Sequence, residues 1–309
     1  MSILDGKENL HHITANSKEE LQPYFDKVSY EACEYSFTTM YMWQQSYGFR
    51  YYKTDKFLLI FGEYEGDIFV INPLCEMQYL DDAFDEIESI FQQLHRPLEF
   101  RAITEEIKEY IEQRYGNYFY YYNVRDNWDY VYEGDKMRTL AGRKLHSKKN
   151  HFNSFLKQYE ERYEYRLLSQ DEFEGCIELE ERWARTKEND QNLISERLAI
   201  SKIFSNIRYF PDIRVGGMYI DGKLEAFSIG DLILPNMALI HVEKANPDIR
   251  GLYIAMSVFF LQSEFENAEL INREDDLGME GLRQAKLSYK PYKMVEKYWI
   301  TKTEQKDAM

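Results

Sequence analysis

The sequence is poor in the features that mark secreted, metal-binding and membrane proteins. Its three cysteines stand far apart, at positions 33, 75 and 176, so they indicate neither a disulfide framework nor a paired-cysteine zinc site. No apolar run approaches the roughly 18 residues of a membrane span, and the first residues lack the basic-then-apolar pattern of a signal peptide. Tracts rich in proline, glycine and serine are also missing. We therefore expect a cytoplasmic protein with no membrane span, no metal site and no flexible linker.

Charge is distributed very unevenly along the chain. There are 38 Lys+Arg against 54 Asp+Glu, a formal net charge of -16, but residues 1–135 account for -15 and the remainder for only -1. A length of 309 residues suggests about two domains, and the change in charge places their boundary near residue 135. We predict domains 1–135 and 136–309, of which only the second tolerates an anionic partner.

The apolar pattern of the second domain predicts helices and strands in a specific order. Helical spacing marks 145–159, 171–187, 192–206, 250–267 and 278–289, and strands are predicted at 163–169, 213–234 (a hairpin around Asp221-Gly222), 237–245, 268–272 and 295–300. From residue 163 the order is β-α-α-β-β-β-α-β-α-β, which is the element order of GNAT-type acyltransferases.

The first domain contains the same kinds of element. Helices are predicted at 30–45 and 80–95, three strands within 49–73, and further strands at LEFRAI, NYFYYYNV and WDYVYE. This is consistent with a degenerate copy of the second domain, although no identity between the halves proves duplication. We predict an α+β protein with two GNAT-like mixed-sheet domains in tandem, an acyl-CoA N-acyltransferase-like fold.

Two segments carry a family resemblance. GRKLHSKKNHFNSF (142–155) and INREDDLGMEGLRQAKLSYKP (271–291) resemble hallmark segments of the phosphatidylglycerol lysyltransferase C-terminal domain family. Members are similar in fold to the FemABX-like aminoacyltransferases, which pair two GNAT-like domains. The resemblance implies transfer of an acyl or aminoacyl group to an amine, with a CoA thioester or aminoacyl-tRNA as donor. Membrane lysyltransferases carry a large transmembrane module before this domain, and its absence here argues against a membrane lipid as acceptor.

The junction HVEKANPDIRGLYIAM (241–256) is the candidate donor site. N–H groups at the start of a helix favour an anion, and the resemblance implies a donor pyrophosphate there, in the pattern Gln/Arg-x-x-Gly-x-Gly/Ala. Arg250 and Ala255 match its ends, but Tyr253 replaces the middle glycine, so Gly251 is the alternative point of close approach. The predicted binding residues are Lys244, Arg250, Gly251, Leu252, Tyr253, Ile254 and Ala255. A Pro-Asp turn before a helix, with no ligand, explains the same residues.

A basic cluster precedes this junction, in a strongly acidic chain. On the helix predicted at 145–159, Lys148 and His151 share one side with the preceding Lys144, beside the apolar stripe. Such a strip suits contact with the phosphates of a nucleotide or of RNA. A solvated helix face that neutralises the acidic first domain is the alternative. We predict Lys144 and Lys148 as accessory phosphate contacts.

Acylation of an amine needs a base for the amine proton and often an acid for the leaving group. Glu243, near the end of its strand and predicted on the same face as His241 and Leu239, is the first candidate for the base. His241 is the second, although a lone histidine in a strand is often structural. Tyr289 is in a position similar to the GNAT tyrosine that protonates a thiolate, although a core role is equally consistent in a chain with 26 tyrosines.

The segment NREDDLG (272–278) lacks the alternating spacing of a calcium loop. We interpret its acids as the capped start of a helix, with Asp275 or Asp276 as N-cap, rather than as a metal site. Asn272, at the end of its strand, and Arg283 and Lys286, on the next helix, are predicted to face the cleft and contribute to donor binding.

The leading functional hypothesis is an acyl or aminoacyl transferase that acts by direct attack, without an acyl-enzyme. Its partners are a small-molecule acyl donor, with CoA or acyl-CoA slightly favoured, or charged tRNA, which the negative charge disfavours and the resemblance favours. The sequence does not identify the amine acceptor. The alternative is a non-catalytic module on the same fold that senses a ligand or binds a protein.

Overall fold

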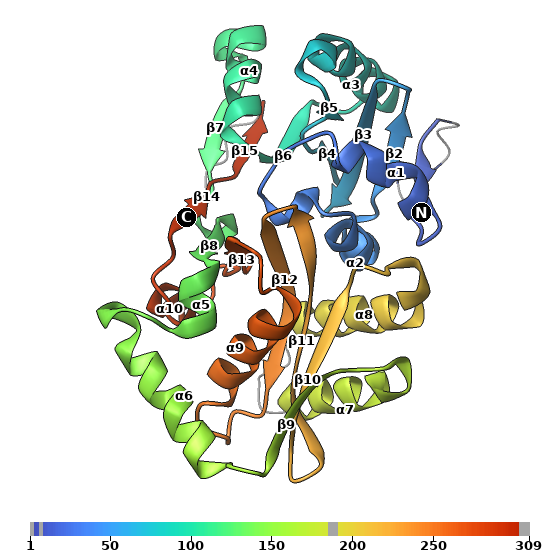
Figure 1. The fold of residues 1–309 in the computed structure, drawn as a ribbon. Helices are drawn as coiled ribbons and strands as arrows, with labels where there is room; N and C mark the ends of the chain where they lie inside the picture. The colour runs from blue at the N-terminus through green and yellow to red at the C-terminus, as the bar shows by residue number, and fades with distance from the viewer. Residues whose placement is uncertain (1–2, 6–8, 185–190, 303–309) are drawn as a thin grey trace. The chain divides into compact units, whose positions relative to one another are not determined.

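The computed structural model describes residues 3–5, 9–184 and 191–302. The chain divides into two compact units, residues 129–294 and a discontinuous unit made of residues 1–128 and 295–309. Each unit is built on its own mixed sheet with helices packed against it (Figure 1). In these described ranges, no helix combines the length and the apolar character needed to cross a membrane.

The sheet of the first unit has the strand order β1-β2-β3-β4-β6-β15-β7, and β5 pairs with β3. The strands are β1 (His11–His12), β2 (Arg50–Lys53), β3 (Phe57–Tyr64), β4 (Asp67–Val70), β5 (Leu74–Cys75), β6 (Glu99–Ile103), β7 (Tyr120–Asn123) and β15 (Tyr298–Thr301). The α-helices are α1 (Ser17–Phe25), α2 (Phe37–Tyr47), α3 (Leu80–Leu94) and α4 (Glu105–Tyr115). The β4–β6 pair is parallel, which requires the crossover that α3 supplies.

Helix α3 illustrates why apolar spacing predicts some helices well. Its buried residues recur three or four positions apart, at 80, 83, 84, 87, 90, 91 and 94, which is the stripe of a helix lying on a sheet. Helix α4 has only two buried residues, Ile107 and Ile111. Because this apolar stripe is weak, the sequence of α4 shows no clear helical period.

The sheet of the second unit has the order β14-β8-β13-β12-β11-β10-β9. The strands are β8 (Asp129–Glu133), β9 (Tyr163–Leu167), β10 (Arg214–Ile220), β11 (Lys223–Leu234), β12 (Met237–Ala245), β13 (Leu270–Asn272) and β14 (Lys293–Val295). The α-helices are α5 (Gly134–Thr139), α6 (His146–Gln158), α7 (Phe173–Ala184), α8 (Gln191–Ser205), α9 (Leu252–Glu264) and α10 (Glu280–Ser288). The predicted turn between β10 and β11 is confirmed, because Asp221 and Gly222 both have positive φ, 51° and 78°, as a type I′ hairpin turn requires.

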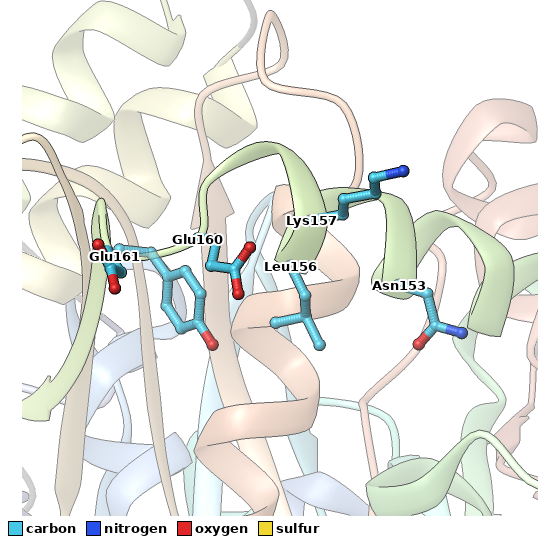
Figure 2. Close-up of a pocket in the computed structure, with 6 residues that line it drawn as sticks. Asn153, Leu156, Lys157, Glu160 and Glu161 are labelled. Carbon is cyan, nitrogen blue, oxygen red and sulfur yellow. The ribbon is translucent and has the colours of Figure 1, made fainter.

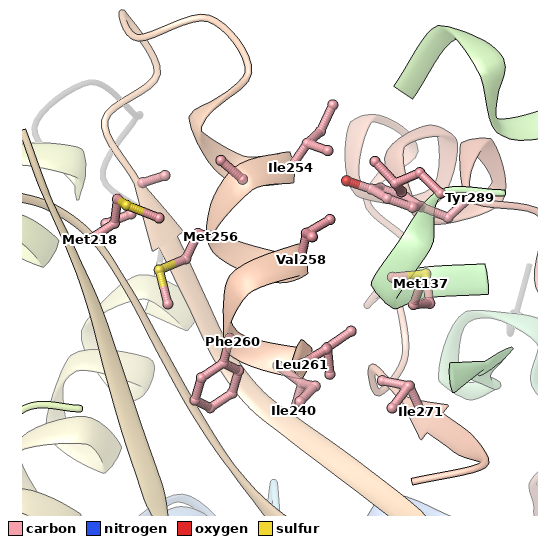
Figure 3. Packing of buried hydrophobic residues seen from close by; sticks show 14 of the residues in the cluster. Met137, Met218, Ile240, Ile254, Met256, Val258, Phe260, Leu261, Ile271 and Tyr289 are labelled. Carbon is pink, nitrogen blue, oxygen red and sulfur yellow. The ribbon is translucent and has the colours of Figure 1, made fainter. Parts of the chain in front are cut away.

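Helix α9 is the centre of the second unit's core. It is apolar on all sides, and its buried residues include Met256, Val258 and Phe260. Figure 3 shows Met256 and Phe260 directed toward the sheet and Val258 toward Met137 and Tyr289. A helix without a polar face must be covered on both sides, and here the sheet covers one side while α5 and α6 pack on the other.

Two strands lie in a different sheet from the one that the sequence suggested. β8, predicted with the first domain, pairs with β13 in the second sheet, and β15, predicted to close the second sheet, pairs with β6 and β7 in the first. The predicted domains 1–135 and 136–309 therefore do not coincide with the two units. When short strands have similar compositions, their own sequences do not show which strands they pair with. The helix predicted at 171–187 is α7 as far as Ala184, and residues 185–187 lie outside the described residues.

Candidate functional site

The site begins where two parallel strands of the second sheet separate. β12 pairs with β13 only from Met237 to Leu239, but it stays paired with β11 on its other edge as far as Ala245. From residue 240 onward, β13 therefore no longer covers the edge of β12. Such an edge exposes backbone donors and acceptors to a further partner.

A buried ion pair lies at this opening. Nη2 of Arg273, the residue after β13, donates to Oε2 of Glu243 at 3.0 Å, and the two side chains are only 14% and 9% exposed. One further atom of each group, Oε1 of Glu243 and Nη1 of Arg273, is buried and has no hydrogen-bond partner among the described residues. A buried polar atom that stays unpaired costs about 1–3 kcal/mol. Two such atoms in one ion pair make this position the candidate for a ligand site.

Aromatic rings and a second cation surround the pair. The Arg273 guanidinium lies 5.0 Å from the ring centroid of Tyr289 and 6.0 Å from that of Tyr132, and Nζ of Lys148 lies 4.2 Å from the Tyr289 centroid. The structure thus brings together Glu243, Tyr289 and Lys148, which the sequence analysis proposed separately. Arg273 was not among the predicted residues, because its segment was interpreted only as a run of acids before a helix.

These surroundings set the protonation of the site. Burial raises the pKa of Glu243, and Arg273 opposes that rise. Burial raises the pKa of Tyr289 to about 12 despite the nearby guanidinium. Burial also lowers the pKa of Lys148, and the charge of Arg273 adds to this effect. At neutral pH the Tyr289 phenol is therefore protonated, and Glu243 is a stronger base than an exposed carboxylate.

His241 has a different environment. Its side chain is 1% exposed, with Nε2 at 3.0 Å from Asp231 Oδ1 and Nδ1 at 3.3 Å from Glu274 Oε1. Burial alone lowers the pKa of His241, but the two carboxylates outweigh it and raise the pKa to about 10. Both ring nitrogens then carry protons that are engaged by carboxylates. His241 is suited to hold the loop after β13 against β12, and less suited than Glu243 to accept a proton.

A β-bulge changes the face on which Glu243 lies. Ile229 pairs with Val242 and Gly230 with Ile240, so His241 is the extra residue. The α9-side core contains Ala238 and Ile240 before the bulge but Ala245 after it. Leu239 and Glu243 are therefore on opposite faces, contrary to the prediction from simple alternation. The bulge directs Glu243 toward the side where α9 lies.

The start of α9 is tightly covered by α6. Gly251 has φ 86°, and a Cβ at this position would lie 2.8 Å from the carbonyl oxygen of His151 and 3.1 Å from Cβ of Phe155. The close approach that requires a glycine here is therefore made by the backbone of α6. Arg250 Nε donates to Nδ1 of His151 at 3.3 Å, so Arg250 joins the same two elements.

The other residues predicted at this junction contribute mainly to packing. Leu252, Ile254 and Ala255 are buried in the core. Burial raises the pKa of Tyr253 to about 12.

Three further predicted binding residues hold the loop that carries Arg273. Asn272 is fully buried and donates to Asp129 Oδ2 at 3.0 Å. Nζ of Lys286 donates to the backbone carbonyls of Arg273 at 2.6 Å and Glu274 at 3.3 Å. These contacts position the loop, so neither group is presented to a phosphate.

Arg283 and the acidic residues before α10 also hold the loop that carries Arg273. Arg283 makes a bidentate contact with Asp276, with Nε at 2.8 Å and Nη2 at 2.7 Å, and burial of Asp276 is outweighed by its hydrogen bonds, which lower its pKa to about 2. Helix α10 begins at Glu280 after Met279 as N-cap. The predicted N-cap role of Asp275 or Asp276 is therefore wrong.

Two predicted lysines lie away from the ion pair. Lys144 is exposed just before α6. Lys244 is buried, with Nζ 2.7 Å from Glu196 Oε2 and 3.6 Å from the ring centroid of Trp183. Since neighbouring residues of a strand point to opposite faces, Lys244 lies on the α7 and α8 side of the sheet and Glu243 on the other.

An open hollow of about 600 Å³ lies where α6 turns into β9 (Figure 2). Its lining residues are Asn153, Leu156, Lys157, Glu160, Glu161 and Tyr163. None of the candidate catalytic residues lines it. We therefore place the candidate site at the opening between β12 and β13, where the unpaired buried atoms are.

Comparisons with known proteins agree with this fold. A protein of unknown function from Bacteroides thetaiotaomicron has 26% sequence identity and a TM-score of 0.89, covering 94% of this chain and 98% of its own. The L-PGS structure from Bacillus licheniformis has 13% identity and a TM-score of 0.69, with coverage of 97% and 95%. FemX has 8% identity and a TM-score of 0.66, with coverage of 94% and 96%.

The family assignment rests on the sequence. The model of the family described as "Phosphatidylglycerol lysyltransferase, C-terminal" matches residues 25–301, and the fold is the tandem GNAT-like α+β arrangement that FemX and a tandem GNAT protein also show. The chain therefore belongs to the phosphatidylglycerol lysyltransferase C-terminal family.

Proposed function

We propose that this protein transfers an acyl or aminoacyl group from an activated ester or thioester to an amine, by direct attack at the opening between β12 and β13. The observation that carries the proposal is the pair of unpaired buried atoms, Oε1 of Glu243 and Nη1 of Arg273. The carboxylate oxygen can accept a hydrogen bond and the guanidinium nitrogen can donate one. Amine acylation needs both, one group for the amine proton and one for the oxygen that becomes negative.

The chemistry assigns one step to each group. The amine nitrogen attacks the donor carbonyl and gives a proton to Oε1 of Glu243, while Nη1 of Arg273 donates to the developing oxyanion. The attack forms the new C–N bond, and collapse of the intermediate re-forms the carbonyl double bond and breaks the C–O or C–S bond to the donor. The Tyr289 phenol, which burial keeps protonated, gives its proton to the leaving oxygen or sulfur. Glu243 then releases its proton to solvent, and the Tyr289 phenolate takes up a proton from solvent.

Two donor classes suit this step, a CoA thioester and an aminoacyl-tRNA. The sequence slightly favoured CoA, but the carbonyl of His151 against Gly251 leaves little room for a pyrophosphate at the start of α9. The exposed basic residues Arg143, Lys144 and Lys149 have no carboxylate partner in the part of the chain that the structure describes, and they suit the phosphates of a longer donor. We therefore propose aminoacyl-tRNA as the first donor to test and acyl-CoA as the second.

The test is transfer of a radiolabelled group from charged tRNA, and separately from acetyl-CoA, to lysine, ethanolamine or a dipeptide. Glu243→Gln is expected to lower kcat/KM by about 100-fold or more, because general-base catalysis typically contributes 10²–10⁴-fold, while donor binding persists. Glu264→Gln is the matched control, since Glu264 is a partly buried carboxylate bonded to Tyr165, away from the site. It is expected to retain wild-type turnover.

The two alternatives give different results in the same assay. Wild-type turnover by Glu243→Gln would contradict the assignment of the base. Donor binding without transfer by the wild-type protein would favour the ligand-sensing alternative, and binding of neither donor would contradict the proposed function itself.

A further inference from the structure

A second unpaired carboxylate lies on the other side of the same sheet. Glu180 belongs to α7, which packs on β11 and β12. Its side chain is 0% exposed, and neither carboxylate oxygen has a hydrogen-bond partner among the residues the structure describes. A buried carboxylate without hydrogen bonds is unusual, because its desolvation costs several kcal/mol unless a cation compensates for it.

In the described ranges, the cations nearest to Glu180 are bound to other carboxylates. Lys244 donates to Glu196 at 2.7 Å, and Arg197 donates through Nη1 to Glu181 at 3.1 Å. The closest approach to Glu180 is Arg197 Nε, 4.0 Å from Oε2, which is beyond hydrogen-bond distance. Among the residues that the structure describes, three carboxylates thus share two cations, one positive charge fewer than they need.

Solvent reaches this cluster from one side. The side chains of Arg197 and Glu181 are 43% and 41% exposed, whereas Glu180 is buried behind them in the same cluster. The cluster adjoins the strand of the reaction site, because Lys244 follows Glu243 on β12 and its Nζ lies 3.6 Å from the ring centroid of Trp183. A ligand held by Glu180 would therefore lie beside the strand that carries the proposed base.

We propose that Glu180 is the anchor of a subsite for a primary ammonium group on the amine acceptor. A –NH₃⁺ group supplies the missing charge and can donate to both carboxylate oxygens. This ammonium is not the attacking amine, since a nitrogen that stays protonated has no lone pair to attack a carbonyl. The acceptor then carries two amino groups, one held at Glu180 and the other presented to Glu243. This inference rests on the proposed transferase function for its biological meaning.

Charge argues that the subsite belongs to the acceptor and not to the donor. The basic residues that suit donor phosphates lie on and just before α6, with Lys148 beside Tyr289. The Glu180 cluster lies on the α7 and α8 side, and its described residues include more carboxylates than cations. It repels a polyphosphate or an RNA strand and attracts a small cation.

The first experiment measures binding without any donor. The protein is titrated calorimetrically with n-butylammonium chloride, with n-butanol as the neutral probe of the same shape. Wild-type protein is expected to bind butylammonium saturably and butanol not at all, and Glu180→Gln to bind butylammonium at least tenfold more weakly. Glu178→Gln, an exposed carboxylate on the same helix, is the matched control and should bind like wild type.

A folding defect is not expected to explain weaker butylammonium binding by Glu180→Gln. Glu180→Gln removes a buried charge and keeps the shape, so its thermal midpoint is expected to equal or exceed that of the wild type. Equal butylammonium binding by wild type and Glu180→Gln, or no saturable binding by the wild type, would overturn the subsite.

The second experiment separates this subsite from the proposed function. In the transfer assay with a diamine acceptor, Glu180→Gln should raise the acceptor KM about tenfold and leave the donor KM unchanged, while Glu243→Gln lowers kcat but still binds butylammonium. Glu180-dependent binding without any transfer would support the subsite and refute the transferase. Transfer with an acceptor KM that Glu180→Gln does not change would refute the subsite alone.

Discussion

His241 illustrates how a single residue type acquires its role from its neighbours. A histidine near the end of a strand was a reasonable candidate base from the sequence. Between Asp231 and Glu274 it becomes a buried imidazolium, because two carboxylates outweigh the effect of burial and raise its pKa to about 10. A substitution of His241 therefore tests its contribution to stability more directly than a contribution to catalysis.

His241 predicts a specific dependence of stability on pH. Its pKa rises from the ordinary value of 6.5 to about 10 on folding, so the protonated form stabilises the fold below pH 6.5, and this contribution is lost as the pH rises from 6.5 to 10. Urea unfolding of the wild type should show a loss on the order of 2–5 kcal/mol over this range. His241→Asn should be less stable at pH 6 and should lack most of that loss.

Comparison with another histidine controls this prediction. His146 is exposed at the start of α6, and His146→Asn should retain the wild-type profile. If wild type and His241→Asn lost the same stability between pH 6.5 and 10, the imidazolium between Asp231 and Glu274 would be contradicted. The comparison cancels other groups that titrate in this range, such as Lys202, whose pKa burial lowers to about 8.

Arg273 shows the limit of sequence reasoning at the residue scale. It lies in INREDDLG, a segment that the family resemblance had already marked, but three acids follow it and suggested a helix start. Only the parallel pairing of β12 with β13 brings it to Glu243. An arginine directly after a strand, next to a strand that ends in a candidate base, is the signal that could have found it.

At the scale of elements, the contact between α6 and α9 is the most constrained feature. Gly251 has a positive φ, and a Cβ there would come within 2.8 Å of the His151 carbonyl oxygen, so both its backbone and its surroundings exclude a side chain. Any other residue at this position must move α6, which also carries Lys148 to the ring of Tyr289. Packing and the candidate site are thus coupled through one glycine.

Gly251→Ala is expected to destabilise the protein by about 2 kcal/mol or more, from the left-handed backbone and the clash with α6. Gly281→Ala is the matched control, because Gly281 lies in α10 with nothing within 4 Å of its Cβ position, and alanine favours a helix by up to about 1 kcal/mol. The check is the free energy of unfolding in urea for both variants. A Gly251→Ala protein as stable as Gly281→Ala would contradict the close contact.

Other elements differ in how far their own pattern predicts them. α3, α7 and α9 have long apolar stripes or fully apolar sequences and were predicted close to their observed bounds. α4 and α5 have few buried residues, so no strong period marks them. The bulge at His241 also has no local signature, because it arises from pairing with β11.

At the scale of the whole molecule, the division into units is not sequential. β15 lies between β6 and β7 in the first sheet, although it follows the entire second unit in the chain. The second unit, residues 129–294, is continuous and contains β8, which supplies the pairing partner of β13. The first unit is complete only when residues after 294 are present.

These connections predict how fragments behave. A fragment of residues 129–294 is expected to fold cooperatively, as judged by thermal unfolding followed by circular dichroism, because its sheet and core are retained. A fragment of residues 1–128 is expected to show no cooperative transition, because without β15 the inner edges of β6 and β7 lose their partner and the fully buried Ile300 is missing from the core.

The fragment prediction has its own control. Joining residues 295–302 to the end of fragment 1–128 through a flexible linker should restore a cooperative transition, because β15 can then pair with β6 and β7. A cooperative transition in fragment 1–128 alone would contradict the role of β15. The sequence-based boundary, which cuts after residue 135, would place β8 and β15 each with the wrong fragment.

The sequence by itself determined the features that depend on local pattern: the α+β class, the GNAT-like order from β9 to α10, most helices and the family. It also suggested Glu243, Tyr289 and Lys148 as candidates, because residue type and position near an element's end are local properties. Only the tertiary structure decided which sheet takes β8 and β15, that Arg273 meets Glu243, and that Glu180 is buried without a partner. Strand pairing and burial depend on contacts between residues far apart in the chain, so they cannot be read from any single stretch of sequence.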